Sequence, residues 1–112
     1  MRMNSVTLVG RAGSDPVARY FESGSVQVVL DLLVNRRSQQ DAPDAFSLEL
    51  WGKQAQIAAD HVRKGCLIGI IGSVKRSPSD SIEGSHVYIR VDRLELLGPP
   101  LAVKVELEGS NG

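Results

Sequence analysis

The chain has 112 residues, of which 42% are hydrophobic, and its 13 basic and 13 acidic residues give a net charge of zero. These values predict one globular domain with its own core and exclude wholesale disorder. No apolar run reaches the length of a membrane span, no apolar signal-peptide core follows the first residues, and the single cysteine excludes an internal disulfide. We therefore expect a reduced, cytosol-like compartment. Any binding of nucleic acid requires cations that are concentrated locally, because the net charge supplies no general attraction.

Strand-like segments bounded by turn signals occupy most of the chain. The first is interrupted by GRAGSDP (10–16), in which two glycines and an Asp-Pro pair predict a turn. In the third, Phe46, Leu48 and Leu50 lie on one face and Trp51 on the other. In chain order, the five predicted strands are 5–9 with its continuation 17–21, 26–34, 45–51, 66–74 and 86–97.

The fourth and fifth strands carry further signals. Gly69 and Gly72 predict bends of the fourth strand at a barrel corner. The residues of the fifth strand that we expect to face the core are Val87, Ile89, Val91 and Leu94. Polar loops are predicted over 35–44 and 75–85.

One helix is predicted near 53–63, between the third and fourth strands. Its apolar face follows the i, i+3, i+4, i+7 rule and consists of Ala55, Ala58, Ala59 and Val62. Gly52 permits the entry turn, Arg63 and Lys64 lie in the last turn, and Gly65 suits the C′ position. A single helix between the third and fourth of five strands is the element order of an OB-fold, an all-β Greek-key barrel that binds oligonucleotides and oligosaccharides.

The barrel is expected to span residues 1–98 and to end at the Gly-Pro-Pro sequence 98–100. Residues 99–112 form a C-terminal extension. Within it, LAVKVELE (101–108) alternates apolar and polar residues with a period of two. This pattern predicts an additional strand and not a linker.

The chain resembles the bacterial single-stranded DNA-binding proteins, and within them the cyanobacterial or plastid type. The resemblance is colinear over residues 4–98. The matching motifs are NSVTLVGR (4–11), DP (15–16), RYF (19–21), VNRR (34–37), LWGK (50–53), VRKG (62–65) and VDRLELLG (91–98). The resemblance implies an OB-fold that assembles as a homotetramer and wraps single-stranded DNA in replication, repair and recombination. The expected location is the cytoplasm with the nucleoid, or the plastid stroma for a plastid-type protein.

Binding of single strands requires a basic groove and aromatic faces on which bases stack. The family usually has aromatic residues at four such positions, and only Trp51 remains here: Ser38-Gln39-Gln40, Ala45 and Ser77-Pro78-Ser79 occupy the other three. Because one stacked base is worth about 1–3 kcal/mol, we expect weaker and more salt-dependent binding than is usual for the family. The basic residues expected to contact phosphates are Arg11, Arg19, Arg36, Arg37, Lys53, Lys64, Lys75 and Arg76.

The C-terminal end also departs from the family, which generally has an acidic tip that recruits replication and repair enzymes. Residues 106–112 (ELEGSNG) contain no acidic cluster and no terminal phenylalanine. Recruitment of such partners therefore stays open. The missing aromatics and the neutral net charge favour a divergent paralogue.

Two interpretations of the function remain. The first is a weak single-strand binder that acts through Trp51 and the basic loops, without cofactor or metal. The second is an OB-fold structural or protein-interaction module, in which Trp51 lies at a subunit contact and Arg36 and Arg37 are simply solvated. His61 and His86 form no metal-ligand pattern with the single cysteine, and no nucleophile–base pair indicates an enzyme. Tyr20, Phe21 and Phe46 are expected in the core or at an interface.

Overall fold

The computed structural model describes residues 3–38, 40–78 and 86–100. The strand predicted over 101–108 lies outside the described residues. No helix in the described ranges is long and apolar enough to cross a membrane. In chain order the elements are β1 (Val6–Ala12), β2 (Val17–Tyr20), β3 (Val26–Val34), β4 (Asp44–Trp51), α1 (Gly52–His61), β5 (Leu67–Arg76) and β6 (Val87–Gly98).

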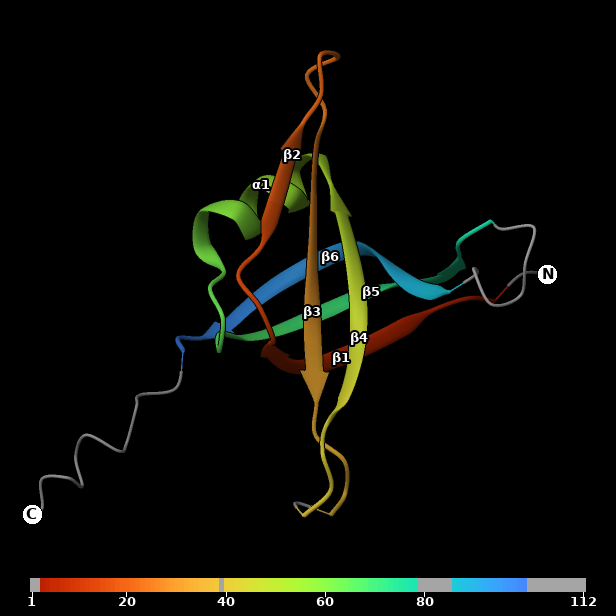
Figure 1. Ribbon diagram of the computed structural model, residues 1–112, viewed down its shortest axis with the longest axis vertical. Helices are drawn as coiled ribbons and strands as arrows, with labels where there is room; N and C mark the ends of the chain where they lie inside the picture. Colours follow the sequence, from red (N-terminus) through yellow and green to blue (C-terminus); the bar gives the residue numbers. More distant parts are fainter. Residues whose placement is uncertain (1–2, 39, 79–85, 101–112) are drawn as a thin grey trace, which may run out of the picture.

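The strands form one closed barrel (Figure 1). Their order is β1-β5-β6-β4-β3-β2, and a further pairing of β1 with β3 closes the sheet. β4 and β6 are parallel, whereas the other pairs are antiparallel. β2 pairs with the first half of β3, and β1 pairs with its end, so these two strands are the two parts of the interrupted first strand. The predicted OB-fold, with its helix before the penultimate strand, is confirmed.

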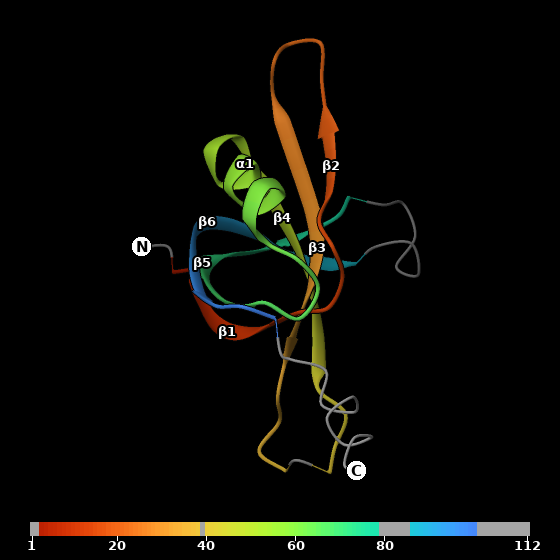
Figure 2. The same ribbon diagram turned by 90° about the vertical axis from the view of Figure 1, so that its left-hand side faces the viewer.

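The core is made by the alternate residues of β3 and β4 and by apolar residues of β5, β6 and α1. Its largest fully buried side chains are Leu30, Leu32, Leu48, Leu50, Ile68, Ile70, Val28 and Val62. Each such side chain contributes roughly 1.5–3 kcal/mol to the free energy of unfolding. α1 packs on β3, β4 and β6 and covers one end of the barrel (Figure 2). Of the predicted helix face, Ala55 and Ala58 are fully buried, as is Val62 directly after the helix, and Ala59 is partly buried against the core.

The end of α1 differs from the prediction. The helix stops at His61, so Arg63 and Lys64 lie beyond its last turn. Gly65 is therefore not the C′ residue. It has a φ of 93° and belongs to a separate turn, in which the Cys66 N–H donates to the carbonyl of Arg63 at 2.9 Å. Arg63 still complements the helix end, because its Nη1 donates to the carbonyl oxygens of Ala59 and Val62 at 3.1 and 2.6 Å.

The strands β5 and β6 continue beyond the barrel as a two-stranded ribbon. β5 runs to Arg76, two residues further than predicted, and the Ser77 N–H donates to the carbonyl of His86 at 2.8 Å. The prediction that Val87 faces the core is wrong: Val87 is 59% exposed, because the alternation of β6 runs on past the closed barrel.

The corner predicted at Gly72 is confirmed. The register of β5 against β6 shifts between Ile71 and Gly72. A Cβ atom on Gly72 would overlap the carbonyl oxygen of Arg90. Only glycine allows the two backbones to approach this closely, so Gly72 permits the close pairing of β5 and β6 at this register shift.

Candidate nucleic-acid interface

The outward residues of β2, β3, β4 and β6 form a continuous surface, which we call the outer face. Across the antiparallel pairs, Arg19 lies opposite Gln27, and Gln27 lies opposite Trp51. The next row along the strands consists of Val17, Val29, Glu49, Arg90 and Ser73. β5 and β6 add one more pair of opposite residues to this surface, Lys75 and Tyr88. Residues that are far apart in the sequence are thus neighbours because of sheet register.

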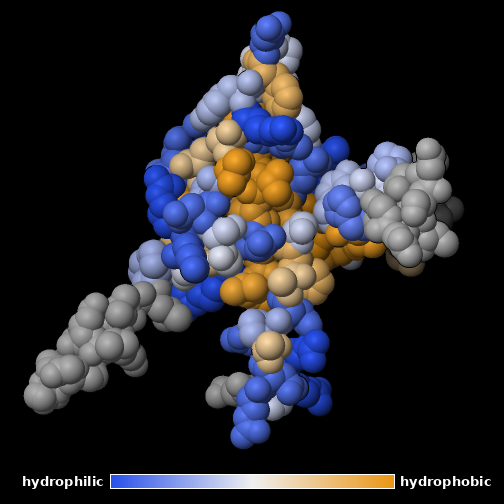
Figure 3. Space-filling model, in the orientation of Figure 1, coloured by the Kyte–Doolittle hydropathy of each residue, from blue (hydrophilic) through white to orange (hydrophobic). Residues whose placement is uncertain are grey.

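The outer face combines apolar and charged groups. Val17 and Val29 oppose each other and are 65% and 43% exposed. Figure 3 shows apolar residues gathered on the side where β3 and β4 lie in front, with hydrophilic residues around them. Exposed apolar groups with a polar rim are typical of binding surfaces. The face therefore suits a ligand that has both flat apolar groups and charges.

Trp51 lies on this face and stacks against Phe21. Their ring centroids are 5.8 Å apart, with an interplanar angle of 26°. Phe21 follows β2 directly and is 42% exposed, so it is not a core residue. The indole Nε1 is buried and has no hydrogen-bond partner among the described residues. The ring of Trp51 is consequently held by packing alone, as one half of an aromatic pair.

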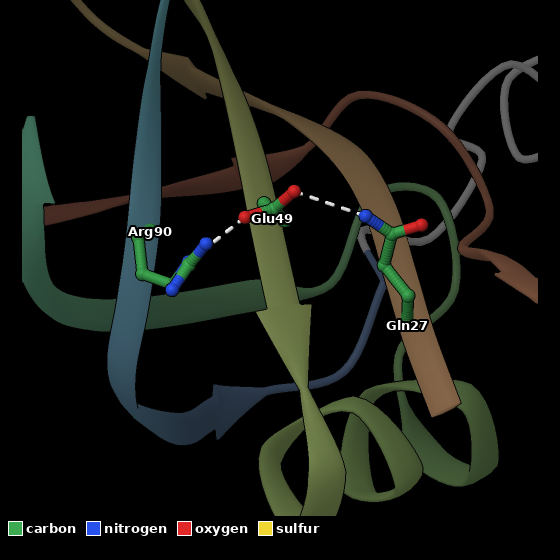
Figure 4. A network of polar contacts seen from close by, with 3 residues as sticks. All are labelled: Gln27, Glu49 and Arg90. Carbon is green, nitrogen blue, oxygen red and sulfur yellow. Dashed lines mark hydrogen bonds and ion pairs between the residues drawn. The ribbon is translucent and has the colours of Figure 1, made fainter. Parts of the chain in front are cut away.

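Glu49 joins the neighbouring strands through two hydrogen bonds (Figure 4). Its Oε1 accepts from Arg90 Nε at 2.8 Å, and its Oε2 accepts from Gln27 Nε2 at 2.9 Å. The Glu49 side chain is 17% exposed and that of Arg90 is 42% exposed. The bond to Glu49 is the main cause that raises the pKa of Arg90 above its ordinary value, although desolvation opposes it. Arg90 is thus a fixed, permanently charged donor on the outer face.

The structure brings only some of the predicted cations to this surface. Arg19 lies in the row of Trp51, and Lys75 lies opposite Tyr88. Arg76 continues the same ribbon, opposite Val87. Lys53 is exposed in the first turn of α1, directly after the end of β4.

Two other pairs of predicted cations lie elsewhere. Arg36 forms a 2.8 Å ion pair with Asp44, so Arg36 and Arg37 are located where β4 begins, whereas Trp51 is where it ends. Seven residues of strand separate these ends by roughly 23 Å. Arg11 Nη1 donates to the carbonyl oxygens of Gly65 and Pro99 at 3.2 and 3.3 Å.

Lys64 lies in the same turn as Gly65, and its backbone N–H donates to Asp15 Oδ1 at 2.8 Å. The side chain of Arg11 therefore holds the turn after α1 and the end of β6 together. Neither Arg11 nor Lys64 belongs to the outer face.

Sequence reasoning missed Phe21, Glu49, Tyr88 and Arg90 as residues of this surface. The signal for the last two was present, because they alternate with the core residues Ile89 and Val91. The placement of Arg90 beside Glu49 depends on the parallel pairing of β6 with β4. No local sequence pattern specifies that pairing.

Comparisons with known proteins agree with the geometry. The profile of the Single-strand binding protein family matches residues 3–97. The chain is 59% identical over 102 residues to Single-stranded DNA-binding protein 1 of Nostoc sp., covering 88% of this chain and 86% of that protein. It is 52% identical over 101 residues to the Single-stranded DNA-binding protein of Thermosynechococcus vestitus, covering 87% and 84%.

A more remote similarity is that to Single-stranded DNA-binding protein 2 of Nostoc sp., which is 34% identical over 102 residues, covering 88% of this chain and 80% of that protein. The family profile covers the barrel from before β1 almost to the end of β6. The chain therefore belongs to the single-strand binding protein family.

Proposed function

We propose that the protein binds single-stranded DNA without sequence preference through its outer face, as a binding protein and not an enzyme, in replication, repair or recombination. The observation that carries this proposal is the row of Arg19, Gln27 and Trp51 across three strands. An exposed cation and an aromatic ring on one surface are the combination that single-strand binders use, because bases stack on the ring while cations attract the phosphates.

The affinity is expected to be lower than is usual for the family. Three of the four positions where the family has aromatic residues lack them, so fewer bases stack and counterion release becomes the larger share of the binding free energy. Arg90, which Glu49 holds on the outer face, presents N–H donors there, but its charge is offset by the same ion pair.

Trp51 is the single tryptophan of the chain, so its fluorescence reports binding at this place directly. The test is a titration with oligo-dT at two salt concentrations. Quenching that saturates, with an affinity that falls steeply as salt increases, supports the proposal. An unchanged fluorescence and no complex in sedimentation at low salt would contradict it and favour the protein-interaction module.

The protein is further proposed to act as a homo-oligomer. The resemblance to the bacterial single-stranded DNA-binding proteins implies a tetramer. Support comes from exposed apolar residues on β1, β5 and β6: Val9, Ile71 and Leu97 are 54%, 42% and 50% exposed. Val9 lies opposite Gly69, whose missing side chain leaves Val9 and Leu97 close together. Sedimentation of the wild type and of Ile71→Glu tests this, and a wild-type monomer at micromolar concentration would exclude it.

A further inference from the structure

A hollow on the outer face lies between β4 and β6, beside the Glu49–Arg90 bond. It has a volume of about 170 Å³ and is lined by Val29, Ser47, Leu48, Glu49, His86 and Tyr88. Resting on the proposed function, we propose that this hollow binds one nucleobase of the single strand and that Tyr88 is its stacking surface. None of the expected contact residues lies there, so the hollow would be a second base site besides Trp51.

The hollow arises from the way in which the barrel closes. β4 and β6 pair only at Leu48 with Ile89 and at Glu49 with Arg90. Before these pairs in chain direction, the two strands diverge. The first residues of β6 pair with the end of β5 in the ribbon and not with β4. The gap left at Ser47 and Tyr88 is bounded by side chains of both strands and by Val29 of β3.

The lining suits a flat heterocycle. Leu48 is buried and Val29 is 43% exposed, so they supply an apolar floor and side. The Tyr88 ring is half-buried, and the His86 ring lies beside it with ring centroids 6.1 Å apart and an interplanar angle of 48°. Ser47 and Glu49 provide hydroxyl and carboxylate oxygens to the edge of the ring. The volume is well below the roughly 300–1,000 Å³ of sites for drug-sized molecules, so it fits a single ring system.

The charges around the hollow suit a nucleotide and not an uncharged ring. Lys75 lies opposite Tyr88 on β5, and Arg90 follows two residues after Tyr88 on the same side of β6. Both oxygens of Glu49 already accept hydrogen bonds, from Arg90 and from Gln27. The carboxylate of Glu49 and the charge of Arg90 therefore offset each other, and Lys75 is the cation that attracts a phosphate next to the base.

Continuity with the Trp51 surface identifies the ligand further. Along the parallel strands, Trp51 lies two residues after the Glu49–Arg90 pair and Tyr88 lies two residues before it. This offset of four residues corresponds to roughly 13 Å. Trp51 and Tyr88 therefore hold different bases of one strand, which passes over Arg90 between them.

The test compares oligo-dT binding of the wild type, Tyr88→Ala and Tyr88→Phe, followed by Trp51 fluorescence. Tyr88→Ala should weaken binding roughly 5- to 150-fold, the loss of one stacked base, without changing the quenching of Trp51 at saturation. Tyr88→Phe keeps the ring and should bind within about twofold of the wild type. Val87→Ala is the matched control. Val87 directly precedes Tyr88, and its 59% exposed side chain lies on the other side of β6.

A second measurement does not depend on a variant that folds. Wild-type protein is irradiated with an oligonucleotide that contains 5-iodouracil, and the cross-linked peptides are identified by mass spectrometry. Cross-links to Tyr88 or His86 support the base site. If the wild type quenches normally but Tyr88→Ala binds equally well and cross-links occur only near Trp51, the hollow is not a base site and the proposed function stands. If the wild type does not bind at all, both fail.

Discussion

Glu49 and Arg90 face each other across the parallel pair of β4 and β6, with Arg90 Nε donating to Glu49 Oε1 at 2.8 Å. This places a carboxylate in the middle of a surface that is proposed to bind phosphates. The charge of Glu49 is offset by Arg90, so the pair contributes little net attraction. The two residues consequently fix the geometry of the face while limiting its electrostatic potential.

Glu49→Gln removes the negative charge but keeps an oxygen that accepts from Arg90. We expect oligo-dT to bind roughly 3- to 10-fold more tightly at low salt, the effect of one unit charge several ångströms away near a protein surface. The gain should shrink as salt screens it. Glu95→Gln is the control, because Glu95 pairs with Arg93 near Gly69, away from the outer face. Equal gains in both variants would show that only the net charge matters.

Trp51→Ala should weaken oligo-dT binding by roughly 1–3 kcal/mol at every salt concentration, the contribution of one stacked base. Trp51→Phe should retain most of the affinity. The indole Nε1 makes no hydrogen bond with a described residue, so the phenyl ring loses no polar contact and can still stack on Phe21. Both variants lack the fluorescent reporter and are measured by anisotropy of a labelled strand. A loss as large in Trp51→Phe as in Trp51→Ala would argue against stacking.

Cations on and off the outer face should differ in salt dependence. Arg19→Ala and Lys75→Ala should each reduce the slope of log affinity against log salt by about 0.7, the value for one phosphate contact with a single strand. Each should leave thermal stability nearly unchanged.

Arg11→Ala should show the reverse. Its guanidinium holds the carbonyl oxygens of Gly65 and Pro99, so the variant should lose about 1–2 kcal/mol of unfolding free energy while the salt slope stays the same. The double variant Arg36→Ala with Arg37→Ala tests whether the loop between β3 and β4 contacts DNA. A smaller slope of log affinity against log salt in this variant would show that the bound DNA extends to that end of the barrel.

Gly72→Ala should destabilise the protein by roughly 1–3 kcal/mol, the usual cost of overpacking. The added Cβ would overlap the Arg90 carbonyl oxygen and force β5 and β6 apart. Gly98→Ala is the control, since its Cβ would meet Leu67 at an ordinary 3.5 Å. Denaturant unfolding measures both, and equal midpoints would contradict the close approach at Gly72.

The elements of the barrel were predictable because their patterns are local. β3 alternates buried and exposed positions along VQVVLDLLV, and the alanine face of α1 has helical spacing. The predictions were wrong where a local sequence pattern continues beyond the element that it was taken to define. Val87 continues the apolar alternation although the barrel has already ended, and Gly65 has the expected positive φ but serves a later turn.

The site was predictable only in part. Trp51 and Arg19 belong to motifs and do lie in one row. Arg11, in contrast, is in a motif but its side chain is used to join two segments of the fold. Tyr88 and Glu49 come together through the register of non-adjacent strands, which depends on the whole barrel and not on any segment of sequence.

The barrel consists of two antiparallel halves, β1–β5–β6 and β2–β3–β4, which are joined at two places by only two residue pairs each. A single strand lying from Arg19 past Trp51 to Tyr88 and Lys75 would cross from one half to the other over the β4–β6 join. Bound DNA would then contact both halves and hold them together. Binding should accordingly slow amide hydrogen exchange at Leu48 and Ile89, which pair across the β4–β6 join, more than within either half.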